Sequence, residues 1–190
     1  MKWLRNGAAL LLAAVLILTI AACGKQKQAD DALKARFAAL IETDAIEQML
    51  ADPAGHADEI AAYGLDDFAA TFADADAYRS YTVEISVQNT NDFAVQLINV
   101  QMDTDKQGAN GVWFSALSEA APTGLPANYA GDEAVYYYAI ASAALSKEDV
   151  LRTLGEMGIS CVYVKGSEAP DMDAQIDPAD LYTSAVLYEG

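Results

Sequence analysis

The sequence predicts an α+β protein in which short N-terminal helices precede an antiparallel β-sandwich with one inserted helix. Beyond an apolar N-terminal segment, apolar residues first recur at helical spacing. From Tyr81 onward they alternate with polar residues, with the two-residue period of half-buried strands. These strands follow one another without the alternating helices that a parallel sheet requires, which favours an antiparallel arrangement.

The first 22 residues have the order of parts that is typical of a secretory signal. Lys2 and Arg5 are positively charged, residues 7–20 form an uncharged apolar run, and small residues follow. A transmembrane helix is one alternative, but it needs about 20 apolar residues. The run here is shorter and ends in the polar residues 24–28. A signal peptide that is cleaved without lipidation is the other alternative.

The segment Ile20-Ala21-Ala22-Cys23 resembles a bacterial lipobox. The resemblance implies cleavage before Cys23 and lipidation of its sulfur with a diacylglyceryl group. Two acyl chains anchor a protein stably, whereas one myristoyl chain holds it only marginally. We therefore expect residues 1–22 to be a lipoprotein signal peptide and residues 23–30 to be the lipidated cysteine with a polar tether. The mature chain would be anchored to the cell membrane and would face outside the cytoplasm.

The charge of the chain excludes one class of partner. There are 11 basic and 28 acidic residues, a formal charge of −17. Removal of residues 1–22 takes away Lys2 and Arg5 and no acid, so that the charge becomes −19. Because nucleic-acid affinity comes mainly from Lys and Arg at phosphates, we expect no nucleic-acid partner. The same charge repels anionic lipid surfaces, and it favours simple solubility, cation binding or a basic partner.

Residues 31–78 are predicted to form a helical segment. Leu33, Phe37, Leu40 and Ile41 recur at helical spacing and form one apolar stripe. A second helix is expected around Met49, with Thr43 or Asp44 as its N-cap residue. Further short helices are expected near 58–63, ending at Gly64, and near 66–72.

Residues 79–190 are predicted to hold about six strands and one helix. The first strand spans 81–88, and the second spans 93–102, where the apolar face switches between Leu97 and Ile98 and so indicates a β-bulge. The helix begins at Ser146, which forms a capping box with Asp149, and Gly158 follows its end. The other strands are expected at 112–117, 134–142, 159–165 and 181–188, and a long loop at 119–133.

The hairpin formed by 87–93 and 97–102 is similar to one in the immunoglobulin-like domains of bacterial lipoproteins and their FxLYD-type relatives. The resemblance implies that residues 79–190 form an immunoglobulin-like β-sandwich domain. The Phe-x-Leu-Tyr-Asp signature of that family is absent from this chain, and so are the paired cysteines of antibody-type domains.

Few residues are candidates for chemistry. With Cys23 lipidated, Cys161 has no partner for a disulfide and lies in an apolar run that is typical of a core strand. A nucleophilic role for Cys161 would need a base, and His56 is the sole histidine. None of the common hydrolase or phosphate-binding motifs occurs. We therefore expect no cofactor and no enzymatic activity.

Two acidic segments have the composition of cation-binding loops. Residues 103–108 resemble the start of a calcium loop, but Phe114 stands where the closing Glu of such a loop would be. A turn, where Asp and Gly also belong, is the alternative. A second cluster comprises Asp171, Asp173, Asp177 and Asp180. Since the sequence leaves calcium binding open for both, neither is assigned as a metal site.

Aromatic residues are the remaining candidates for a binding surface. Trp113 and Tyr137 lie on predicted strands beside other aromatics, and an exposed Trp with a Tyr would form a sugar-stacking or protein-binding patch. Packing in the core is the alternative. The sequence thus favours a lipid-anchored surface lipoprotein that binds a protein or an envelope polymer. The alternative function is a small extracytoplasmic hydrolase that uses carboxylates in a cleft.

Overall fold

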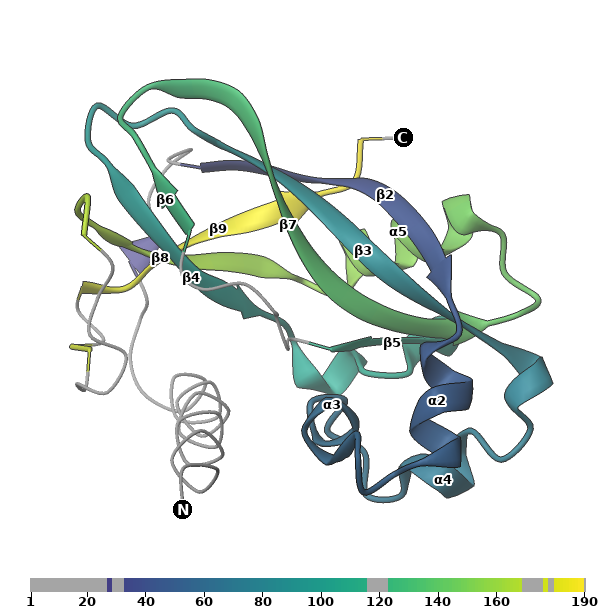
Figure 1. The fold of residues 1–190 in the computed structure, drawn as a ribbon. Helices are drawn as coiled ribbons and strands as arrows, with labels where there is room; N and C mark the ends of the chain where they lie inside the picture. The colour runs from purple at the N-terminus through teal and green to yellow at the C-terminus, as the bar shows by residue number, and fades with distance from the viewer. Residues whose placement is uncertain (1–26, 29–32, 116–122, 169–175, 178–179, 190) are drawn as a thin grey trace, which may run out of the picture.

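The computed structural model describes residues 27–28, 33–115, 123–168, 176–177 and 180–189 (Figure 1). The protein has an α+β fold, as predicted. The described residues form nine strands, which are β1 Lys27–Gln28, β2 Leu33–Thr43, β3 Tyr78–Asn89, β4 Val95–Gln101, β5 Val112–Ser115, β6 Thr123–Leu125, β7 Tyr129–Ser142, β8 Ser160–Lys165 and β9 Tyr182–Leu187. The α-helices are α2 Ala45–Ala51, α3 Ala57–Ala61, α4 Phe68–Thr71 and α5 Lys147–Glu156.

The strands form one continuous curled sheet. Its order is β5-β7-β3-β2-β9-β8-β4-β6, and β1 adds to β9 outside this path. Most neighbouring strands are antiparallel, but both β1 and β2 run parallel to β9. The predicted sandwich of two separate sheets is therefore not confirmed, because the β2–β9 pair joins the two halves of the sheet by hydrogen bonds.

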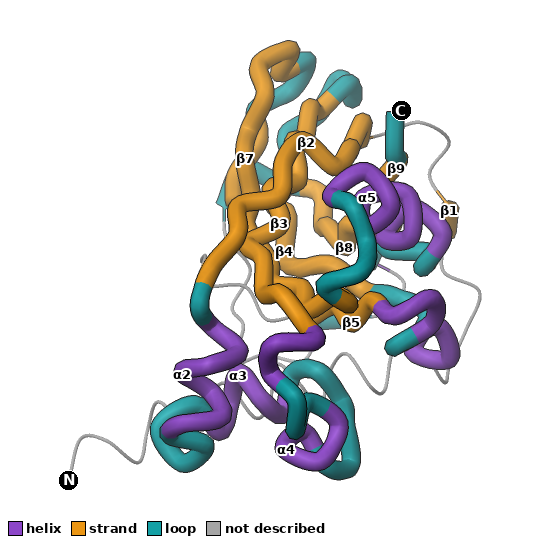
Figure 2. The backbone as a smooth tube through the Cα atoms, turned by 90° about the vertical axis from the view of Figure 1, so that its right-hand side faces the viewer, coloured by secondary structure: helices purple, strands orange, loops and turns teal. Residues whose placement is uncertain are grey.

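The curl of the sheet lets both halves and α5 bury apolar side chains in one core (Figure 2). On β3 the alternation expected from the sequence is present, and Val83, Ile85 and Val87 are fully buried. Further members of this core are Phe114 and Tyr137 from one half, Leu97, Val100, Cys161 and Tyr163 from the other, and Val150, Leu154 and Met157 from α5.

The predicted helical segment 31–78 is wrong over 33–43, because these residues form the long strand β2 between β3 and β9. Leu33, Ala35 and Phe37 alternate inward, and a β-bulge between Phe37 and Ala39 then shifts the phase so that Leu40 also points inward. The bulge places Leu33, Phe37 and Leu40 at the spacing of a helix while the backbone stays extended. Ile41, the fourth member of the predicted stripe, is 50% exposed.

Other elements agree more closely with the predictions made from the sequence. The register of β4 against β8 shifts between Leu97 and Asn99, which confirms the predicted bulge. Ser146 and Asp149 form the expected capping box, and Gly158 adopts a positive φ after α5. The loop predicted at 119–133 instead contains β6 and the first residues of β7.

The short helices α2, α3 and α4 gather at one end of the sheet (Figure 1). Ile46, Phe68 and Phe72 are buried there against Ile140 of β7, in a second apolar cluster. Asp44 occupies the N-cap position of α2 but makes no side-chain capping bond. The hydroxyl of Ser80 on β3 accepts a hydrogen bond from the Ile46 N–H at 3.3 Å instead, which ties the helices to the sheet.

Candidate functional site

The outer surface of β2, β3 and β7 is a broad face of the sheet that carries exposed side chains. Paired residues in an antiparallel sheet lie on the same side of it. Glu84 pairs with both Ala39 and Tyr136, and Ile41 pairs with Thr82, so these side chains lie opposite the core. Helices α2 and α4 cover the end of this surface around Ile140, and no helix of the described chain crosses the rest of it in Figure 1. We call it the open face, defined by Arg36, Ile41, Glu84, Gln88, Asp132 and Tyr136.

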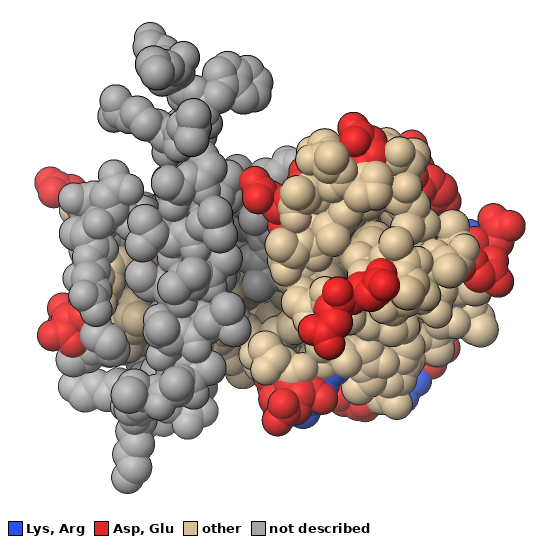
Figure 3. Space-filling view, turned by 90° about the horizontal axis from the view of Figure 1, so that it is seen from below, with Lys and Arg blue, Asp and Glu red and all other residues tan. Residues whose placement is uncertain are grey.

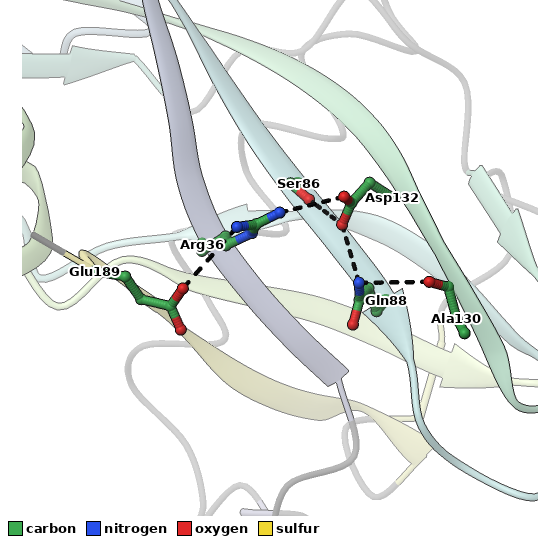
Figure 4. A network of polar contacts seen from close by, with 6 residues as sticks. All are labelled: Arg36, Ser86, Gln88, Ala130, Asp132 and Glu189. Atoms are coloured by element: carbon green, nitrogen blue, oxygen red, sulfur yellow. Dashed lines mark hydrogen bonds and ion pairs between the residues drawn. The ribbon is translucent and has the colours of Figure 1, made fainter.

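One end of the open face carries a network of polar contacts centred on Asp132 (Figure 4). The carboxylate accepts hydrogen bonds from Ser86 Oγ at 2.8 Å, from Gln88 Nε2 at 3.0 Å and from Arg36 Nη2 at 3.2 Å. Arg36 also lies 4.0 Å from Glu189. The hydrogen bonds from Ser86 and Gln88, followed by the charge of Arg36, lower the pKa of Asp132. An ionised carboxylate that is already held by three donors suits a structural or recognition role and not that of a general acid.

The other end of the open face combines apolar and acidic side chains. Tyr136 is 45% exposed and Ile41 is 50% exposed, although both are large and hydrophobic. Glu84 lies beside Tyr136 in the sheet. An exposed aromatic ring and an exposed aliphatic side chain near a carboxylate are suited to a partner that presents basic and apolar groups together.

The two aromatic residues predicted to bind lie in different apolar clusters. Tyr137 is 2% exposed and packs against Phe114 with ring centroids 5.8 Å apart, so its burial speaks against a surface role. Trp113 is half-buried, and its ring meets those of Phe72 and Tyr78 at centroid distances of 5.1 and 5.6 Å. The structure does not bring Trp113 and Tyr137 together. Strand alternation alone could not tell which residue of 136–138 faces outward, since that depends on the register.

The region of α2–α4 is strongly acidic. The predictions from the sequence considered the charge of the whole chain and did not identify this segment. Between Glu42 and Asp76 the chain carries ten carboxylates and no Lys or Arg. Figure 3 views the molecule from the side on which these helices lie, and acidic side chains are prominent over the described surface there. We call residues 42–76 the acidic lobe. A count of acidic and basic residues along the sequence would have shown that this segment is more acidic than the rest of the chain.

The groups considered for catalysis are dispersed or buried. Cys161 is fully buried, and burial raises the pKa of its thiol to about 12, as suits the predicted core residue. His56 lies at the start of α3, where its Nδ1 is 3.7 Å from Glu59 Oε1. Within the described ranges, no group of three or more His, Cys, Asp or Glu side chains is arranged to hold a metal ion.

The first acidic loop is tied into the fold by its own side chains. Asp103 Oδ1 accepts a hydrogen bond from the Asp105 N–H at 3.2 Å, and residues 104–106 form a 3₁₀ turn. Lys106 Nζ donates to the Glu156 carbonyl at 2.7 Å and thereby caps the end of α5. Asp171 and Asp173 of the second acidic cluster lie outside the described residues. The predicted lipidation residue Cys23 also lies outside them.

Comparison with known protein families and with curated proteins finds no match for this chain. Among the helices of the described residues, none has the length and apolar character needed to cross a bilayer.

Proposed function

We propose that the protein is a lipid-anchored extracytoplasmic binding module whose open face takes a basic protein partner. The observation that carries the binding role is Tyr136, which is 45% exposed beside Glu84 on the part of the sheet surface that α2–α4 leave uncovered. Aromatic residues that are exposed on a partly polar surface are typical of protein-binding sites. The formal charge of −17 favours a partner of opposite sign.

The Asp132 network supports this role by keeping one part of the open face rigid. Side chains from β2, β3 and β7 are held together by the bonds of Ser86, Gln88 and Arg36 to Asp132. A surface whose side chains are already ordered loses less conformational entropy when a partner binds.

The membrane anchor is the second part of the proposal and rests on the lipobox. Replacement of Cys23 by Ser removes the sulfur that would carry the lipid, so we expect the processed protein to leave the membrane fraction. Cys161→Ala, which removes the other thiol, is the matched control and should stay with the membrane. If processed Cys23→Ser protein remains membrane-bound to the same extent as the wild type, the anchor is refuted.

We also propose that the two halves of the sheet act as the layers of an immunoglobulin-like sandwich. The support is that the inner faces of both halves share one core. The parallel pairing of β2 with β9 is the departure from two separate layers. Slow hydrogen exchange of the β2 and β9 amides along the whole length of both strands would argue against the immunoglobulin-like assignment.

The binding role is tested by photo-crosslinking on the expressed, membrane-attached protein. A photoreactive amino acid replaces Tyr136, and the control position is Ser167, an exposed residue outside the open face. We expect a discrete protein adduct from position 136 and not from 167, and we expect Glu84→Arg and added salt to reduce its yield. Adducts of equal yield at both positions, or a yield that is insensitive to Glu84→Arg, would contradict the proposal.

A further inference from the structure

The strands run between two chemically different ends of the molecule. The acidic lobe lies at the end where β2 stops and β3 starts. At the opposite end β1 runs alongside β9, with Lys27 paired to Tyr182 and Gln28 to Thr183 (Figure 1). The 12 residues of β3 connect the two ends and span about 40 Å. We call the second region the β1 end.

A cluster of rings and one lysine marks the β1 end. The exposed Lys165 places its Nζ 4.2 Å from the ring centroid of Phe93 and 4.9 Å from that of Tyr182. Tyr163 stacks on Tyr182 with centroids 5.6 Å apart. All these residues come from the places where β4 begins, β8 ends and β9 begins. Partly buried Tyr and Phe rings beside a lysine with a long apolar stem are suited to the interface between lipid and water.

The chain between the lipobox cysteine and β1 is short. Cys23 and Lys27 are separated by four peptide units, which span at most about 14 Å. Because β1 is hydrogen-bonded to β9, the distance between Cys23 and the folded sheet is limited in the same way. An anchor at Cys23 would therefore keep the β1 end close to the bilayer, whichever way the rest of the domain turned.

From these observations we infer that the β1 end rests on the surface of the membrane, with Phe93, Lys165 and Tyr182 at the headgroups and the acidic lobe turned away. This inference rests on the proposed lipid anchor. Asp92 and Glu168 also lie at the β1 end, so the contact depends on the rings and the short tether, and not on attraction to anionic lipid. The ten carboxylates of the acidic lobe add to the orientation, because anionic lipids repel them.

The orientation can be measured without cellular lipidation. The mature chain from Cys23 is coupled through the Cys23 thiol to a maleimide lipid in phosphatidylcholine vesicles that carry nitroxide headgroups. Cys161 does not compete for the maleimide, because it is fully buried. A fluorescent amino acid is placed at Ser167, near the β1 end, or at Ala69 in the acidic lobe, and both positions are exposed. This design separates a failure of orientation from a failure of the anchor in cells.

We expect the nitroxides to quench about half of the emission at 167 and almost none at 69, since quenching needs near contact and the ends lie about 40 Å apart. A Gly–Ser insertion of about 20 residues after Gly24 lengthens the tether by about 25 Å on average and should reduce the difference. Equal quenching at both positions, or stronger quenching at 69, would overturn the inference. If quenching at 167 stays the same after the insertion, the short tether is not what holds the β1 end at the membrane.

Discussion

The side-chain amide of Gln107 binds the backbone of Phe114 in the way that a neighbouring strand would. Gln107 Oε1 accepts a hydrogen bond from the Phe114 N–H at 3.0 Å, and Gln107 Nε2 donates to the Phe114 carbonyl at 2.9 Å. The same Nε2 donates to the Tyr63 carbonyl at 2.7 Å. β5 is the last strand of its half of the sheet, so one side chain both covers its edge and joins it to the acidic lobe.

Replacement of Gln107 by Ala should therefore destabilise the protein by about 1–3 kcal/mol, because it leaves the polar backbone of the buried Phe114 without these partners. Urea unfolding measures the change. Gln48→Ala on the exposed side of α2 is the matched control and should have little effect. If the two variants lose equal stability, the amide of Gln107 does not stabilise the edge of β5. Uncovering that edge should also promote self-association, which size-exclusion chromatography would detect.

Gly108 lies under the indole ring of Trp113, and this contact separates two glycine variants. Both Gly108 and Gly64 have a positive φ, at 75° and 63°, but only at Gly108 would a Cβ meet a ring, 2.7 Å from Trp113 Nε1. Gly64→Ala should cost about 1–2 kcal/mol from its backbone conformation alone. Gly108→Ala should cost more and should alter the emission of Trp113, the sole tryptophan left once residues 1–22 are removed. Equal losses with unchanged emission would contradict the packing of Trp113 on Gly108.

The hydrogen bonds at Asp132 make its contribution to stability dependent on pH. Its pKa in the folded protein is lowered, chiefly by Ser86 and Gln88, so the native state favours the ionised form. The resulting stability is present above the unfolded-state pKa of about 4 and is lost as the pH falls through the lowered folded-state pKa. The difference in urea midpoint between wild type and Asp132→Asn should therefore shrink on acidification. A difference that stays constant, or equals that of Asp66→Asn, would show that the network does not act through ionised Asp132.

Cys161 should be unreactive in the folded protein. Its burial raises the pKa of the thiol to about 12, so little thiolate forms, and no reagent reaches it. In Cys23→Ser protein, an aromatic disulfide reagent should label Cys161 only after urea unfolds the chain. Rapid labelling without urea would place Cys161 outside the core.

The raised pKa of Cys161 also sets the direction of an alkaline effect. The stability that comes from burying the neutral thiol is fully present below the unfolded-state pKa of about 8.5 and is lost as the pH rises toward the folded-state value. Cys161→Ala should lose less stability than the wild type over this range, as followed by urea midpoints. Identical alkaline losses in the two proteins would assign the effect to other groups.

Local patterns predicted the parts of the fold that depend on neighbouring residues. The alternation of 81–88, the bulge after Leu97 and the capping box of Ser146 and Asp149 each involve contacts within a few residues or one repeated period. Such contacts are encoded in adjacent sequence positions, so the sequence alone shows them. The buried position of Cys161 was likewise predictable from the apolar run around it.

The same patterns gave wrong or incomplete predictions where the structure of a segment depends on its pairing with another strand. At 33–43 the bulge produced helical spacing in a strand, and only pairing with β3 and β9 decides that the backbone is extended. The register of β7 against β3 decides that Tyr136 faces outward while Tyr137 is buried. Gln107 gave no sequence signal, since a glutamine that covers a strand edge resembles any polar loop residue.

The sequence by itself thus determined the α+β class, the strand periodicity, the strong negative charge and the prediction of a lipid-anchored chain, because these follow from composition and local order. Only the tertiary structure decided which faces of those strands are buried and that the two halves join through β2 and β9. It also decided that the acidic lobe and β1 lie at opposite ends of the sheet. Those features depend on contacts between residues far apart in the chain, and such contacts form only when the hydrophobic core is closed.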